Sequence, residues 1–166
     1  DEHEKLVTQK KLSELEQMAF RSQMNPHFIF NCLNSIQQYI FSKSVIDANR
    51  FITGFSSLIR QTLDLSSKKF ITLEEEMKYL TTYLKLEHTR FEENFEYEVT
   101  AETDLPLDQL FLPPLLLQPF VENAIRHGIR NMEKGIGHLS IKFYLEENYL
   151  IAVVMDNGIG IDASLK

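Results

Sequence analysis

The sequence predicts an α+β fold, with a helical region up to about Leu65 and a mixed helical and stranded region after it. Two observations predict this division. In the first region, apolar residues recur three and four positions apart, which is the spacing of one helix face. In the second, the segments 95–102 and 138–146 alternate apolar and polar residues, as half-buried strands do. We therefore expect two domains, 1–65 and 66–166.

The composition excludes several classes of protein. Of the 166 residues, 43% are hydrophobic and 25% are charged, which is typical of a globular chain and not of a disordered one. The formal net charge of -7 argues against a nucleic-acid partner, because phosphate binding needs clustered Lys and Arg. No apolar run is long enough to span a bilayer, so we expect no membrane contact by this chain. The chain begins without Met and is expected to be a piece of something longer.

The helical region contains three predicted helices. Residues from Glu2 to about Met24 carry a narrow apolar seam, which fits either a coiled-coil stalk or an amphipathic surface helix. Pro26 should kink the helix or restart it. The helix after Pro26 and a helix from about Val45 to Leu65 form a hairpin. This hairpin is too apolar to stay alone, so we predict a homodimer with a four-helix bundle.

The second region begins with a local helix signal. Thr72 and Glu75 have the spacing of a capping box, which predicts a further helix from there. Pro113 and Pro114 should introduce another helix, from Leu115 to about His127, with Gly128 as its C-terminal cap. The apolar run 150–155 reads as a fully buried strand.

Three motifs then occur in order along the chain: NPHFIFN from Asn25, LQPFVENAIRHG up to Gly128, and DNGIGI from Asp156. In this order and spacing they closely resemble the LytS-type sensor histidine kinases, from about Leu15 to Ile161. The resemblance implies a dimerising segment that accepts a phosphoryl group, followed by an ATP-binding α/β sandwich of the kind shared with Hsp90 and DNA gyrase. The family continues beyond the position of Lys166 with a lid loop and further strands, so the sandwich is expected to be incomplete here and this fragment to be inactive or weakly active alone.

His27 is the predicted phosphoacceptor. An imidazole is mostly neutral at pH 7 and then has one nitrogen lone pair free for attack. A lone histidine beside a helix kink is more often structural, and it is the two later motifs that favour the catalytic reading. Phe28 follows His27 where many histidine kinases have an acidic residue, which departs from that larger pattern but agrees with the LytS-type one. Asn31 and Asn25 are candidate orienting partners.

The second motif supplies candidate residues for the phosphoryl donor site. Glu122 and Asn123 are adjacent on a helix and should point about 100° apart, which suits two roles. Asn123 would be the Mg²⁺ ligand beside the triphosphate, as the resemblance also implies, and Glu122 would polarise a water or the incoming histidine. His127, one turn beyond Asn123, would approach phosphate. The competing interpretation is an ordinary surface pair between Glu122 and Arg126.

The third motif supplies the remainder of the nucleotide site. Asp156 would lie at a strand end, where its carboxylate accepts the adenine amino group. Gly158 and Gly160 would allow the backbone to turn and to approach the nucleotide closely. A strand followed by DNG is also an excellent hairpin turn, and its position after the ENAIRHG helix is what favours the nucleotide reading.

The sequence therefore predicts a sensor histidine kinase of a two-component system, with ATP and Mg²⁺ as cofactors and a response regulator as partner. We expect it in the cytoplasm, as part of a membrane-anchored sensor. The alternative is a non-catalytic dimerisation and phosphotransfer scaffold with a degenerate ATP domain. A metal cluster of His27, His88, His127 and His138 is disfavoured, because their spacing matches no ligand motif. Arg90 resembles a family position of unassigned role.

Overall fold

The computed structural model describes residues 2–21, 26–42, 45–90 and 95–160. The chain divides into two compact units, Asp1–Lys68 and Lys69–Lys166, and each is described by itself. Within the described residues, no helix combines the length and the apolarity that crossing a membrane requires. The roles that the sequence suggests for its two parts remain predictions.

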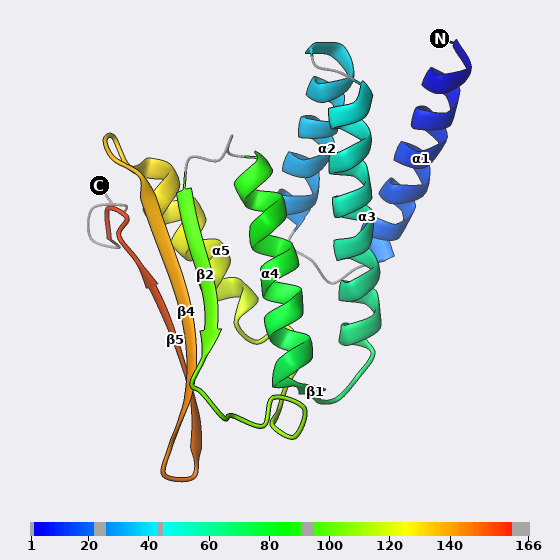
Figure 1. Ribbon diagram of the computed structural model, residues 1–166. Coiled ribbons are helices and arrows are strands. Elements are labelled where there is room, and N and C mark those ends of the chain that lie inside the picture. The colour runs from blue at the N-terminus through cyan, green and yellow to red at the C-terminus, as the bar shows by residue number, and fades with distance from the viewer. Residues whose placement is uncertain (1, 22–25, 43–44, 91–94, 161–166) are drawn as a thin grey trace. The chain divides into compact units, whose positions relative to one another are not determined.

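The first unit consists of three helices, α1 (Glu2–Arg21), α2 (Pro26–Ser42) and α3 (Val45–Ser66), and both α1 and α2 contact α3 (Figure 1). Pro26 is the first residue of α2, where its missing N–H has no intrahelical partner to lose. The predicted helix restart is thus confirmed. The core between α2 and α3 is apolar, and the Phe28 ring meets the Phe55 ring edge-on with centroids 6.4 Å apart. The four-helix bundle with a second copy remains a prediction.

The second unit is built on a three-stranded sheet of β2 (Phe95–Ala101), β4 (Gly137–Glu146) and β5 (Tyr149–Asp156), in the order β2-β4-β5. The β2–β4 pair is parallel and the β4–β5 pair is an antiparallel hairpin. Helices α4 (Leu73–Arg90) and α5 (Gln118–Asn123) lie on one face of this sheet (Figure 1). A small second sheet, which the sequence did not indicate, pairs β1 (Ile71–Thr72) with β3 (Phe111–Leu112).

The predicted capping box at the start of α4 is confirmed. The Thr72 N–H donates to Glu75 Oε2 at 2.9 Å, and the Glu75 N–H donates to Thr72 Oγ1 at 3.1 Å. Two backbone donors at the helix N-terminus are satisfied reciprocally in this way.

The predicted helix 115–127 is wrong at both ends. Leu115 has a φ of 59°, in the left-handed region, and α5 begins only at Gln118, with Pro119 in its first turn. After Asn123 the chain continues as a π-helical turn, Ala124–Gly128, and a 3₁₀ turn, Ile129–Asn131. Gly128 has a φ of −90° inside this continuous helix, so it is not the left-handed cap that we expected.

The apolar run 150–155 does form a strand, but the prediction that it is fully buried is wrong. All eight residues of β5 are half-buried or exposed, and the side chains of Tyr149 and Met155 are 70% and 59% exposed. The reason is topological: within the described residues β5 pairs only with β4 and forms an edge of the sheet.

Candidate nucleotide site and phosphoacceptor

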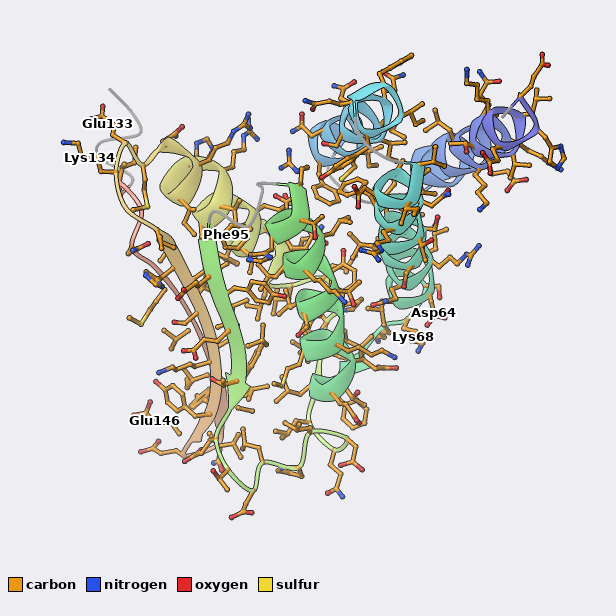
Figure 2. All side chains as sticks on the ribbon, turned by 45° about the horizontal axis from the view of Figure 1, so that its top comes forward. Asp64, Lys68, Phe95, Glu133, Lys134 and Glu146 are labelled. Atoms are coloured by element: carbon orange, nitrogen blue, oxygen red, sulfur yellow. The ribbon has the colours of Figure 1, made fainter. Side chains whose placement is uncertain are left out.

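The predicted nucleotide motifs meet at one end of the sheet. Figure 2 shows Phe95 and the loop of Glu133 and Lys134 at this end, and Glu146 at the opposite one. The strand register agrees, because Phe95 lies opposite Gly137 and Asp156 lies opposite Leu139. The segment that follows Asp156 contacts Gly128, in the helical turn that continues α5.

The closest approach at this end is between two glycines. A Cβ on Gly158 would collide with the backbone Cα and C atoms of Gly128, and a Cβ on Gly128 would lie 2.6 Å from Asp156 Oδ1. The Ile159 N–H also donates to the Gly128 carbonyl at 3.4 Å. Gly128 therefore lets the helix that carries Asn123 touch the glycine motif, which is a role different from helix capping.

Asp156 is the last residue of β5, and its carboxylate is exposed. Side chains alternate along a strand, so Asp156 shares the helix-covered face with its register partner Leu139. Its Oδ1 accepts the Gly158 N–H at 2.8 Å. A carboxylate has about four acceptor positions, so this one retains capacity for an exocyclic amino group.

Asn157, which the sequence analysis passed over, fixes the motif to the neighbouring strand. Its Oδ1 accepts the His138 N–H at 2.6 Å, and its Nδ2 donates to the Ile136 carbonyl at 3.1 Å. Beyond it, Gly160 has a φ of 82° and open space where a Cβ would stand. The motif thus combines one anchored residue with a turn that suits glycine.

Asn123 and Glu122 differ in their surroundings. Asn123 ends α5 and is exposed, as is His127 one turn later. Glu122 is half-buried, and its Oε1 accepts the Gln118 Nε2–H at 2.9 Å. The Asn123 amide and the His127 imidazole are thus accessible to a ligand from solvent, whereas the Glu122 carboxylate lies against a polar layer beneath α5.

That polar layer comes from the inner face of α4. The Arg90 guanidinium donates from Nε and Nη2 to the two oxygens of Glu87, each at 2.9 Å, and the Glu87 side chain is only 2% exposed. Burial raises the pKa of Glu87, opposed by Arg90 and reinforced by the negative charge of Glu122. Burial also raises the pKa of Tyr83 well above its usual value, as do Glu87 and Glu122. Arg90 therefore neutralises a buried carboxylate of the second unit.

His27 is the second residue of α2, and its side chain lies outside the described residues, as does Asn25. The residue after it, Phe28, is 4% exposed and fixes the start of α2 on α3. Asn31, four residues after His27, is half-buried on the same helix. Besides His127, the second unit contains His88 and His138. The His88 ring meets the Phe95 ring edge-on, and His138 Nδ1 is 3.3 Å from a Glu96 carboxylate oxygen.

A hollow of about 430 Å³ lies at the same end of the sheet. Asp156 and Asn157 of the glycine motif line it, and so do four strand residues, Glu96, Glu98, Ser140 and Met155, among others. By strand alternation these four residues lie on the face opposite the helices. Two lining glutamates would repel a triphosphate, so we do not assign the phosphates to this hollow.

The residues on the helix-covered face fit a nucleotide with Mg²⁺. The exposed Asn123 amide is a hard oxygen ligand of the type that Mg²⁺ accepts. The glycine contact brings a helix end and a backbone turn together without side-chain obstruction. The sequence analysis missed Gln118, although its position four residues before Glu122 on a helix is a readable signal.

Comparisons with known proteins identify the family of the chain. The Histidine kinase family model matches residues 15–95. The Sensor protein LytS of Staphylococcus epidermidis (strain RP62A) is 32% identical over 152 residues, which is 92% of this chain and 25% of that protein. The Sensor histidine kinase BtsS of Escherichia coli K12 is 33% identical over 146 residues, which is 88% of this chain and 25% of that protein.

Among solved structures, the histidine kinase domain of the blue-light activated kinase from Erythrobacter litoralis EL346 covers 93% of this chain with a TM-score of 0.43 and 15% identity. The chain spans about a quarter of the length of the curated relatives that it matches. From the family model and the sequence relatives together, the chain belongs to the LytS-type sensor histidine kinases.

Proposed function

We propose that this chain carries the phosphoacceptor and the ATP-binding residues of a two-component sensor histidine kinase. The proposed reaction is ATP-dependent phosphorylation of His27, followed by transfer to an aspartate of a response regulator. The observation that carries the proposal is the contact between Gly128 and Gly158, because it joins the Asn123 helix to the Asp156 turn. Membership in the histidine kinase family implies ATP use.

Each donor-site residue would contact a different part of the nucleotide. The Asn123 amide oxygen would ligate Mg²⁺, and exposed His127 would contact phosphate oxygens. The Asp156 carboxylate would accept a hydrogen bond from the adenine amino group, while Gly158 and Gly160 leave the backbone free to approach the base and phosphates. Bound ATP would supply the γ-phosphoryl group, and its Mg²⁺ would neutralise part of the phosphate charge.

The acceptor chemistry needs a base. A neutral His27 forms an N–P bond with one ring nitrogen as the bond from phosphorus to the ADP oxygen breaks. The proton on the other ring nitrogen must then leave, or the phosphorylated ring stays cationic. Glu122, whose carboxylate is half-buried beside Asn123, is the proposed acceptor of that proton. The reaction requires the His27 unit and the donor unit to meet, within one chain or across the proposed homodimer.

The test is labelling with γ-labelled ATP in the intact natural protein that carries this chain. We expect label that is lost in acid and kept in base, no label in His27→Ala, and no label in Asn123→Ala. The exposed His3→Ala serves as the matched histidine control and should label normally. Label that survives in His27→Ala would contradict the acceptor assignment. Protein that is unlabelled by ATP but labelled by a phosphorylated response regulator would favour the scaffold instead.

A further inference from the structure

A chain of three polar side chains links α4 to α5 inside the second unit. The Tyr79 hydroxyl donates to Gln118 Oε1 at 2.8 Å, and Gln118 Nε2 donates to Glu122 Oε1 at 2.9 Å. Tyr79 is fully buried and Gln118 is 5% exposed, so water does not compete readily for either bond. The chain begins in the core and ends at the residue that precedes Asn123.

The direction of these hydrogen bonds follows from the donors and acceptors that are present. An ionised Glu122 can only accept, so Gln118 must turn its Nε2 toward it. The Gln118 Oε1 is then left for Tyr79, whose hydroxyl must donate. Tyr79 thereby holds the amide in the one orientation that serves Glu122.

Several charged and polar side chains surround Glu122. Glu122 lies close enough to Glu87 for its negative charge to raise the pKa of that carboxyl, after the larger effect of burial. The same charge acts on Tyr83, and Arg90 and Arg130 also face this group of side chains. Glu122 therefore lies among charges of both signs, and the Gln118 bond fixes the position of one of its carboxylate oxygens.

We propose that Gln118, oriented by Tyr79, is a positioning residue that aims the Glu122 carboxylate at the imidazole proton of the incoming histidine. This inference rests on the proposed function, in which Glu122 accepts that proton. When Glu122 becomes protonated it gains a donor, and the Gln118 bond no longer favours one amide orientation. The three side chains therefore hold the proton-accepting form before phosphoryl transfer.

The test compares initial labelling rates of the intact protein at saturating ATP. Gln118→Met removes the amide and keeps the shape, and Tyr79→Phe removes only the oxygen that orients it. We expect the rate to fall about tenfold or more in both, since base catalysis contributes about a hundredfold or more in total. Apparent affinity for ATP should stay within about twofold, because neither group is expected to contact the nucleotide. The exposed Gln109→Met and Tyr149→Phe are matched controls and should label at the normal rate.

Double variants separate positioning from a merely structural role. If Gln118 acts through Glu122, then Gln118→Met added to Glu122→Gln should slow labelling no further. A full additional loss in the double variant, or a normal rate in both single variants while Glu122→Gln is slow, would overturn the positioning role alone. A normal rate in Glu122→Gln itself would instead remove Glu122 from the proposed function. If Gln118→Met does not fold, the same comparison is made with Tyr79→Phe. Tyr79→Phe added to Glu122→Gln should then slow labelling no further than Glu122→Gln alone.

Discussion

Glu76 has a buried carboxylate without hydrogen-bond partners among the described residues. Its side chain is fully buried. Burial raises its pKa to about 7, although the backbone N–H groups of Leu117 and Leu115 face the carboxylate and oppose the shift. We take these two groups as nearby dipoles and not as hydrogen bonds, because the bonding geometry is not met.

The raised pKa of Glu76 predicts how stability depends on pH. The folded state holds the proton up to about pH 7, and the unfolded state releases it near pH 4.5. Stability is therefore fully present below pH 4.5 and is lost as the pH rises toward 7, by about 3 kcal/mol in total. Glu76→Gln should be more stable than the native chain by about 1 to 3 kcal/mol at pH 8, with little difference at pH 5.

Urea denaturation of this chain between pH 5 and 8 measures the effect. The control is Glu74→Gln, an exposed neighbour on the same helix, which should leave the pH dependence unchanged. Parallel pH profiles for Glu76→Gln and the native chain would show that Glu76 is not the titrating group.

Arg90 gives the second prediction at the residue scale. Removing it leaves the Glu87 carboxylate buried without its bidentate partner. Breaking a buried ion pair from one side costs about 3 to 5 kcal/mol, so Arg90→Met should lower the free energy of unfolding by that order. The double variant with Glu87→Gln should recover part of the loss, because the unpaired buried charge is then gone. An Arg90→Met variant as stable as the native chain would mean that Glu87 finds another partner, and the absence of any recovery in the double variant would show that the unpaired Glu87 carboxylate is not the source of the loss.

At the scale of elements, the decisive contact is between Gly128, at the end of the π-helical turn that follows α5, and the turn after β5. Gly128 has a φ that alanine also adopts, so the cost of Gly128→Ala lies in the contact with Asp156 Oδ1 and not in backbone strain. We expect ATP affinity to fall about tenfold, because the displaced carboxylate no longer meets the adenine amino group.

Calorimetric titration of the intact protein with Mg-ATP measures this affinity. The control is Gly135→Ala, which carries backbone strain at a φ of 89° but whose added Cβ would meet only the end of the Met132 side chain, at 4.0 Å. Gly135→Ala should bind ATP normally. Equal affinities for Gly128→Ala and the native protein would contradict the role of the glycine contact.

Elements with local signals were predictable, and those set by distant contacts were not. The capping box of Thr72 and Glu75 and the restart at Pro26 depend on neighbours within four residues, and both are confirmed. The late start of α5 depends on the left-handed Leu115, and the exposure of β5 depends on its place at the sheet edge. Neither the start of α5 nor the exposure of β5 can be predicted from a short window of sequence.

The site divides in the same way. The motifs identify Asn123 and Asp156 because their residue types and order are specific, whereas the hydrogen bond from Tyr79 to Gln118 joins residues 39 positions apart. A buried tyrosine and glutamine in amphipathic helices look like ordinary core and surface positions until the helices are packed. The Gly128 contact was likewise misread as a helix cap, since a glycine after a helix is more often one.

At the scale of the whole molecule, the proposed acceptor lies in the first unit and the proposed donor site in the second. His27 is the second residue of α2, and Asn123, Asp156 and the glycine contact lie together in the second unit. The two assignments depend on each other, because a nucleotide site without a reactive histidine would make a binding module and not a kinase. Their union in one chain is the central claim.

The most direct test of this claim is to locate the phosphoryl group. The intact protein is incubated with Mg-ATP, digested at alkaline pH to preserve phosphohistidine, and sequenced by mass spectrometry. We predict one phosphoryl group on His27, present in the native protein and absent from both His27→Gln and Asn123→Ala. A phosphoryl group on any other residue, or on His27 in Asn123→Ala at the native level, would contradict the account.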